Sequence, residues 1–196
     1  MTTASHKPEV TTHLERTEAP GSMLTHAAVC ALAVLRISTG AVFLWAFLDK
    51  TFGFGYATPD ARAWINGGSP TKGFLSNVDV GPFQSFFHSI AGTWWADWAF
   101  MLGLAGIGIA LILGIGMRIA AASAVLMMGL MWLAEFPFDK TTAAGAASGS
   151  TNPIFDYHII YGLVAIVLAL TYAGQTWGLG RWWAQLPFVQ RHRWLI

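Results

Sequence analysis

Charged residues are scarce in this sequence of 196 residues, and the shortage excludes several classes of protein. Aspartate, glutamate, lysine and arginine together make up 11% of the chain, whereas a soluble domain usually carries about 25%. The formal net charge is only +1. No basic patch interleaved with aromatic residues appears, which argues against a nucleic-acid-binding protein. The composition therefore indicates a membrane protein.

Cysteine and the common catalytic motifs are equally scarce. The single cysteine, Cys30, cannot form a disulfide within the chain and excludes an internal CxxC redox relay. The sequence contains no phosphate-binding Gly-Lys loop, no GxSxG and no HExxH. The six histidines are scattered, and only His158 falls where a helical bundle could enclose it. Neither haem nor a metal site is predicted.

Hydrophobic residues are abundant instead: they make up 55% of the chain, and the mean hydropathy is +0.51. The ten tryptophans suit a protein that lies at bilayer interfaces. A helix that crosses a bilayer needs about 20 apolar residues. Four runs reach or approach that length, at about 23–48, 98–116, 119–134 and 157–172. The sequence therefore predicts an all-α polytopic membrane protein whose four transmembrane helices form a bundle within residues 23–175.

The other segments are assigned to the membrane surfaces. Residues 1–22 form a polar tail that lacks the apolar core of a signal peptide. The long connection over residues 49–97 contains the aromatic, amphipathic stretch GPFQSFFHSIAGTWWADW, which begins at residue 81 and predicts an extra helix along the outer interface. Residues 176–196 pair tryptophan with arginine, as expected of an interfacial C-terminal tail beside anionic lipid.

Both termini are expected in the cytoplasm. Lysine and arginine are enriched in cytoplasmic loops, and this orientation places six of them inside and four outside. The expected location is therefore a cell membrane that the chain crosses several times. The inner residues would be Lys7, Arg16, Arg118, Arg181, Arg191 and Arg193, and the outer ones Lys50, Arg62, Lys72 and Lys140.

Helical spacing assigns faces to the first two spans. The second span carries a row of small residues at steps of three and four, which in lipid usually packs against another helix. We expect that row to be buried. It consists of Ala99, Gly103, Gly106, Ala110 and Gly114. In the first span Arg36 shares one face with four residues that follow at steps of four and three, namely Gly40, Phe43, Phe47 and Lys50.

Arg36 is an unusual residue for a hydrophobic span, because a charge in lipid costs from about 2.5 to more than 10 kcal/mol. No acidic residue lies at a similar depth in the sequence, so its expected partners are helix carbonyls or a carboxylate from the outer surface. The topology brings the outer helix ends together there. These ends carry Asp49, Lys50, Asp97, Glu135, Asp156, Tyr157 and His158.

The start of the last span supplies part of that outer group. Asn152 and Pro153 are expected to cap and begin its helix, which places Asp156 in the first turn. His158 and Tyr161 are three residues apart and share a face, so they could bind a polar head group or relay protons. A functional and a bundle-internal structural role carry equal weight for Arg36, Lys50, Asp156, His158 and Tyr161. Asp97 and Asp139 are expected to be structural.

Three segments together resemble the DoxX/DoxD-type family of membrane proteins. The first is ALAVLRISTGAVFLWAFLDKTFG, with Arg36, Gly40 and Lys50 in the family's pattern. The second, GLAGIGIALILGIGMRIAA, resembles the central hairpin, and the third, NPIFDYHIIYGLVAIVLAL, resembles the start of the last helix. The resemblance implies a four-helix membrane bundle and a link to quinones and sulfur-compound oxidation. It also implies a second subunit, as in thiosulfate:quinone oxidoreductase.

The leading hypothesis is a membrane subunit of a quinone-linked redox system, linked to oxidation of thiosulfate or a related compound. The quinone head group would lie between the first and fourth spans, contacted by Arg36, Gly40, Lys50 and Tyr161. Arg36 would stabilise its developing negative charge, and Asp156 or His158 would exchange protons. One alternative is a non-catalytic anchor for a partner oxidoreductase. Another is a small-solute transporter, although no inverted repeat is evident. The expected partner is a second protein subunit, or another copy of the chain in a homo-oligomer.

Overall fold

The computed structural model describes residues 25–196, and within that range the chain is all-helical without strands. Three helices are long and apolar enough to cross a membrane: α2 (His26–Phe52), α5 (Trp94–Leu113) and α6 (Met117–Glu135). A shorter apolar helix, α7 (Tyr157–Leu170), lies beside α6. The predicted all-α membrane class is confirmed at this level. The predicted tail over residues 1–22 lies outside the described residues.

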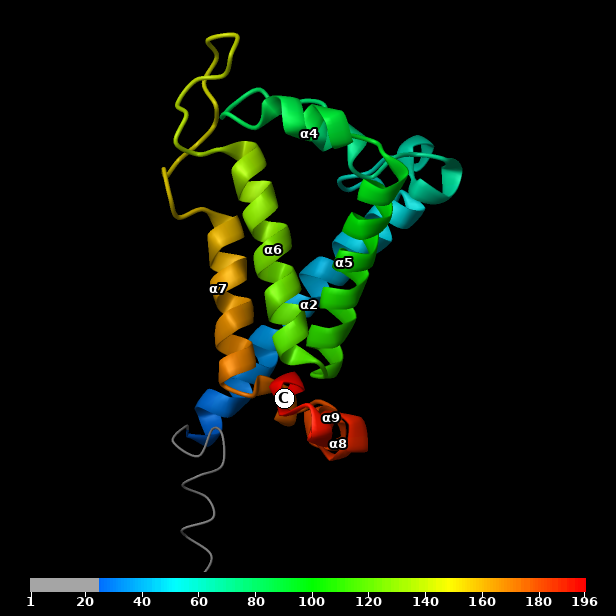
Figure 1. The fold of residues 1–196 in the computed structure, drawn as a ribbon, viewed down its shortest axis with the longest axis vertical. Coiled ribbons are helices and arrows are strands. Elements are labelled where there is room, and N and C mark those ends of the chain that lie inside the picture. Colours follow the sequence, from blue (N-terminus) through cyan, green and yellow to red (C-terminus); the bar gives the residue numbers. More distant parts are fainter. Residues whose placement is uncertain (1–24) are drawn as a thin grey trace, which may run out of the picture.

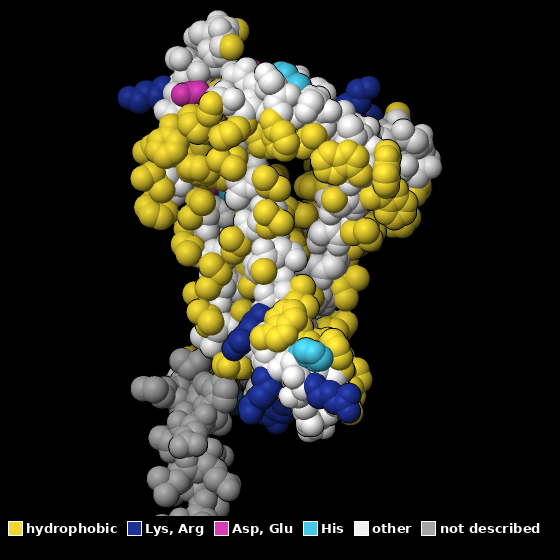
Figure 2. Space-filling model, in the orientation of Figure 1, with side chains coloured by type: hydrophobic (Ala, Val, Ile, Leu, Met, Phe, Trp, Pro, Cys, Tyr) yellow, Lys and Arg dark blue, Asp and Glu magenta, His cyan; other side chains and the backbone are white. Residues whose placement is uncertain are grey.

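The four apolar helices form two packed pairs, α2 with α5 and α6 with α7 (Figure 1). The turn between α5 and α6 contains Gly114 and Gly116, both in the left-handed region with φ of 73° and 56°. Glycine adopts this conformation without a steric penalty, which allows the two helices to reverse direction within three residues. The predicted antiparallel hairpin is therefore confirmed. Figure 2 shows the apolar side chains that cover the flanks of the bundle.

The inward face predicted for the first span is confirmed. Arg36, Gly40 and Phe43 are buried, and Phe47 and Lys50 are half-buried. Gly40 lies where α2 crosses α5, since a Cβ added there would meet the Gly108 carbonyl oxygen at 2.9 Å. This glycine admits a neighbouring helix, and the structure leaves no space for a ligand at its Cα.

The small-residue row on α5 is buried only in part: Gly114 is buried and Gly103 and Ala110 are half-buried, but the rest of the row faces outward. Ala99 and Gly106 are exposed, and a Cβ added to Gly106 would meet nothing within 4 Å. The buried face of α5 lies about a third of a turn away and is mostly bulky. A single close approach at Gly108 is enough for the helix crossing, and large side chains fill the rest of the interface. The buried residues are Ala96, Asp97, Met101, Leu104, Ile107, Gly108 and Leu111.

The start of the last helix also differs from the expectation. Asp156, not Asn152, is the N-cap of α7, and its Oδ1 accepts hydrogen bonds from the backbone N–H groups of His158 at 3.0 Å and Ile159 at 3.2 Å. Asn152 instead closes a turn, where its Oδ1 accepts from the N–H groups of Ile154 and Phe155. Aspartate and asparagine are equally good caps. Composition alone therefore does not choose between them.

Short helices cover both ends of the bundle. We keep the name outer end for the end of the bundle that the sequence predicts outside, where α5 and α7 begin, and inner end for the opposite one. At the outer end, α3 (Lys72–Leu75) and α4 (Gln84–Ile90) lie in the long connection, with α4 across the top of the view in Figure 1. The tryptophans at 94 and 95 belong to α5 rather than to this connection. On the inner side, α8 (Gly180–Gln185) and α9 (Pro187–Arg191) lie below the helix ends, where a hydrogen bond from the Leu179 N–H to the Leu113 carbonyl ties the C-terminal segment to α5.

Candidate functional site

Arg36 is fully buried; backbone carbonyls accept hydrogen bonds from both terminal nitrogens of its guanidinium, whereas its Nε has no partner among the described residues. Nη1 donates to the carbonyl oxygens of Leu111 and Ile112, the latter at 2.7 Å. Nη2 donates to the carbonyl oxygens of Thr176 at 3.2 Å and Trp177 at 2.9 Å. The first two carbonyls lie at the C-terminus of α5, where the helix dipole is negative and a cation is stabilising. The sequence left two partners open for Arg36, helix carbonyls or a carboxylate from the outer surface. In the structure its partners are carbonyls.

Two glycines, Gly114 and Gly178, make room for the Arg36 side chain at this inner end. A Cβ added to Gly114 would lie 3.0 Å from Nη1, and one added to Gly178 would lie 3.1 Å from Nη2. Gly114 and Gly174 also touch each other through their backbones, with 2.7 Å between an added Gly114 Cβ and the Gly174 Cα. The arginine therefore joins α2, the end of α5 and the C-terminal segment in one tightly packed junction.

The structure separates Arg36 from the outer charged group. Arg36 precedes Lys50 by fourteen residues on α2, which corresponds to about 21 Å along the helix. Asp156 and His158 lie at the start of α7, at the outer end of the bundle. One quinone head group cannot contact Arg36 and His158 together, so the expected single site that contains both is wrong.

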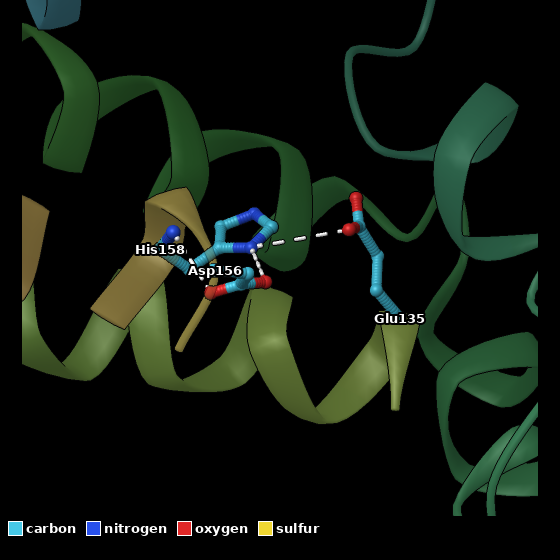
Figure 3. A group of neighbouring side chains, drawn as sticks. All are labelled: Glu135, Asp156 and His158. Atoms are coloured by element: carbon cyan, nitrogen blue, oxygen red, sulfur yellow. Dashed lines mark hydrogen bonds and ion pairs between the residues drawn. The ribbon is translucent and has the colours of Figure 1, made fainter. Parts of the chain in front are cut away.

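At the outer end, three side chains from two helices converge (Figure 3). The Nδ1 atom of His158 lies 2.9 Å from Oδ2 of Asp156 and 3.9 Å from Oε2 of Glu135. His158 is fully buried, whereas the side chains of Asp156 and Glu135 are 15% and 38% exposed. We call Glu135, Asp156 and His158 the outer triad. It contains two of the residues predicted from the sequence and adds Glu135, the last residue of α6.

Tyr157 flanks the outer triad, whereas Tyr161 faces α2. The Tyr157 hydroxyl donates to Oε1 of Glu135 at 3.0 Å, and the Tyr157 ring lies over the His158 ring with 3.9 Å between centroids. Tyr161 points to α2, where its ring meets the edge of Phe43 at 6.0 Å. The sequence places Tyr157 at the outer surface but does not select it as a candidate site residue. The residue spacing could have indicated it, because Tyr157 and Tyr161 are adjacent on the helix.

A cavity of about 440 Å³ opens beside the outer triad and is lined by Glu135, Asp156 and Tyr157 on one side. The connection around α3 also lines it, with the apolar side chains of Phe74, Val78 and Val80 and the polar ones of Asn77 and Asp79. Small-molecule sites usually have volumes of about 300–1,000 Å³ and combine apolar walls with a few polar groups. The cavity therefore has the size and the lining of a binding site for a small organic molecule.

Lys50 lies in a second outer cavity of about 700 Å³, which it shares with Arg62 and Lys72. Its ammonium lies 6.0 Å from the centre of the Phe100 ring. Phe74 lines both cavities, so α3 separates them. The structure thus divides the predicted outer group in two, with Lys50 on one side of α3 and the outer triad on the other.

The two predicted structural carboxylates are occupied by local contacts. Asp97 accepts three hydrogen bonds through Oδ1, from the Ser69 hydroxyl and from the N–H and hydroxyl of Thr71. Asp139 accepts from the Gly81 N–H at 2.7 Å. Both carboxylates hold loops of the outer surface, as expected.

No match was found in any of three comparisons, with protein-family models, with curated proteins or with solved structures. The DoxX/DoxD resemblance rests on the three quoted segments. The function is therefore argued from the arrangement of the outer triad, its cavity and the Arg36 junction.

Proposed function

We propose that the chain crosses the membrane four times, with α7 as the fourth span and both termini in the cytoplasm. All seven carboxylates within residues 25–196 lie toward the outer end of the bundle, and this asymmetry supports the orientation. At about 1.5 Å per residue, α7 is about 21 Å long, so the turns beside it would complete the span. The helix α4 would lie along the outer interface, with Phe87 buried and Phe86 exposed to lipid.

Within this membrane, we infer that the protein is a quinone-linked redox subunit. The observation that carries the proposal is the cavity of about 440 Å³ at the outer ends of α6 and α7, whose lining combines polar groups with apolar side chains. A quinone ring needs both: apolar surface for its faces and hydrogen-bonding groups for its two carbonyl oxygens. In the proposed orientation the cavity would lie at the level where the head group of a membrane quinone meets water.

The proposed roles differ from those expected from the sequence. The Tyr157 hydroxyl, which now donates to Glu135, would turn to donate to a quinone carbonyl. Asp156 would form part of the polar lining, and His158 behind it would hold the Asp156 carboxylate in place through the 2.9 Å contact. Arg36 and Gly40 are assigned to packing, because carbonyls and α5 already surround them.

The electrons must come from a second protein, since the chain carries one cysteine and no redox motif. In this proposal the partner oxidises thiosulfate or a related sulfur compound and delivers two electrons. The quinone takes up these electrons with two protons from the outer aqueous side and becomes the quinol. A protein partner or a second copy of the chain is therefore part of the proposal.

The test is binding of decylubiquinone to the purified protein in nanodiscs, followed by quenching of tryptophan fluorescence. Tyr157→Phe removes one hydrogen bond and should weaken binding about fivefold, since such a bond contributes about 1 kcal/mol. Thr151→Trp places a large side chain in the cavity wall and should abolish binding, whereas Thr151→Ala should not.

Tyr56→Phe is the matched control, because Tyr56 is an exposed outer tyrosine that does not line this cavity. Equal affinity in the wild type, Tyr157→Phe and Thr151→Trp would contradict the proposed site. Absence of quinone binding in the folded wild type would contradict the function itself.

The second candidate is a non-catalytic anchor for a partner oxidoreductase, and the Arg36 junction favours it. The one buried cation of the described spans is used in packing, as an anchor would require. Native mass spectrometry of protein extracted gently from its own membranes separates the two candidates. A stoichiometric polypeptide without bound quinone favours the anchor, and bound quinone favours the redox subunit.

A further inference from the structure

We propose that the outer triad is a binding site for one divalent transition-metal ion. Its three ligand atoms would be Nδ1 of His158, Oδ2 of Asp156 and Oε2 of Glu135, and one atom from each residue lies within 4.8 Å of the others. This site departs from the sequence, which predicted no metal. It does not depend on the proposed binding of quinone.

The ring nitrogen lies at distances from the two carboxylate oxygens that one ion can bridge. Bonds from zinc to histidine nitrogen and to carboxylate oxygen are about 2.0–2.2 Å long. Two atoms on the same ion can therefore lie at most about 4.2 Å apart. Nδ1 of His158 lies 2.9 Å from the Asp156 oxygen and 3.9 Å from the Glu135 oxygen, so both pairs satisfy this limit.

The second atom of each carboxylate is already held in place. Oε1 of Glu135 accepts from the Tyr157 hydroxyl at 3.0 Å. Oδ1 of Asp156 accepts from the backbone N–H groups of His158 and Ile159 as the cap of α7. Outer partners of this kind orient metal ligands and contribute to affinity. Each carboxylate thus turns one fixed oxygen toward Nδ1.

The electrostatics of the outer triad also call for a cation. Within residues 25–196, neither Glu135 nor Asp156 forms an ion pair with a lysine or arginine, and histidine is their only ion-pair partner. His158 is fully buried, and its Nε2 has no hydrogen-bond partner in this part of the chain. An ion at Nδ1 would leave the ring neutral, with its proton on Nε2. It would also neutralise the two carboxylates together.

The ligand set selects the class of ion. One imidazole with two carboxylates suits Zn²⁺, Mn²⁺ or Fe²⁺, whereas Ca²⁺ and Mg²⁺ prefer oxygen ligands alone. Glu135 and Asp156 also line the cavity of about 440 Å³, so water or a small ligand can reach the remaining positions on the ion. Three protein ligands with an open position are typical of catalytic zinc sites.

The experiment is titration of Zn²⁺ into the full-length protein in detergent, after removal of metals with EDTA, by isothermal calorimetry. The wild type should bind one Zn²⁺ at a site that Glu135→Gln and Asp156→Asn each weaken by about 100-fold or more, since outer-shell changes alone cost 10–100-fold. Asparagine is also an effective N-cap, so Asp156→Asn should keep the helix start.

Asp79→Asn is the matched control, because Asp79 lines the same cavity but lies outside the outer triad. Its zinc affinity should equal that of the wild type. Zinc bound elsewhere on the chain would persist in Glu135→Gln and Asp156→Asn, and unchanged affinity in both would overturn the proposal. So would a folded wild type that binds no Zn²⁺. Melting curves without metal establish that each variant is folded.

Discussion

Replacement of Arg36 by methionine should destabilise the bundle at its inner end without altering the outer site. Methionine preserves much of the side-chain length but removes every donor. The carbonyls of Ile112, Thr176 and Trp177 would then lose the partner that the structure gives them, while the Leu111 carbonyl keeps a contact with the Gly114 N–H. A buried acceptor without a partner costs about 1–3 kcal/mol, so three carbonyls set a loss of about 3 kcal/mol as the lower estimate.

The measurement is thermal unfolding of the purified protein in micelles, followed by tryptophan fluorescence. For a chain of this size each kcal/mol corresponds to about 2–4 °C, so Arg36→Met should lower the melting temperature by about 10 °C. Trypsin should also cleave faster after Arg181, because the Arg36 bonds to residues 176 and 177 help to hold the C-terminal segment. Arg118→Met is the control and should cost less than about 1 kcal/mol, since Arg118 makes a single 3.3 Å bond to the Tyr172 hydroxyl.

The outcome that refutes this reasoning is specific. If Arg36→Met melts with the wild type but loses bound quinone, then the arginine serves a ligand and its carbonyl contacts are incidental. If it melts earlier and, at a temperature where it is folded, binds quinone as the wild type does, then Arg36 is a packing residue.

Two further predictions concern packing and the outer loop. Gly108→Leu should destabilise the protein by several kcal/mol, because a Cβ at Gly108 would lie 2.7 Å from the Leu44 nitrogen. Gly106→Leu should be nearly neutral, since a Cβ there would meet nothing within 4 Å. The melting temperatures of the two variants check this difference. Asp49→Ala should release the loop after α2, since the Asp49 carboxylate accepts hydrogen bonds from the N–H groups of residues 56, 57 and 58. Trypsin cleavage after Arg62 should then accelerate, while cleavage after Arg181 should not change.

The sequence predicted the features that depend on local pattern. Hydropathy identified the apolar helices, and helical spacing placed Arg36, Gly40 and Phe43 on the inward face of the first span. The same spacing argument held only in part on α5, where Gly114 is buried but Ala99 and Gly106 are exposed, because a row of small residues defines a face without saying what lies opposite. In a soluble protein water would decide which face is buried, but lipid accepts glycine and leucine alike.

The contacts that decide the function join residues far apart in the sequence. The carbonyls that bind Arg36 lie 75 to 141 residues away, and backbone acceptors leave no trace in amino-acid identity. Glu135 and His158 meet because α6 and α7 pack side by side, with the ring of His158 turned to the end of α6. Sequence reasoning placed both at the outer surface. It could not say that the carboxylates of Glu135 and Asp156 both face Nδ1 of His158.

The two ends of the bundle therefore solve different electrostatic problems. At the inner end, the negative C-terminus of α5 and the guanidinium of Arg36 stabilise each other through the Nη1 bonds, and Nε of Arg36 is the one guanidinium nitrogen without a hydrogen-bond partner within residues 25–196. At the outer end, Glu135 and Asp156 face one imidazole, and neither carboxylate has a lysine or arginine partner within residues 25–196. Chemistry that requires a bound molecule or ion is thus expected at the outer end. Zinc binding that is lost in Glu135→Gln, together with quinone binding that survives in Arg36→Met, would locate it there.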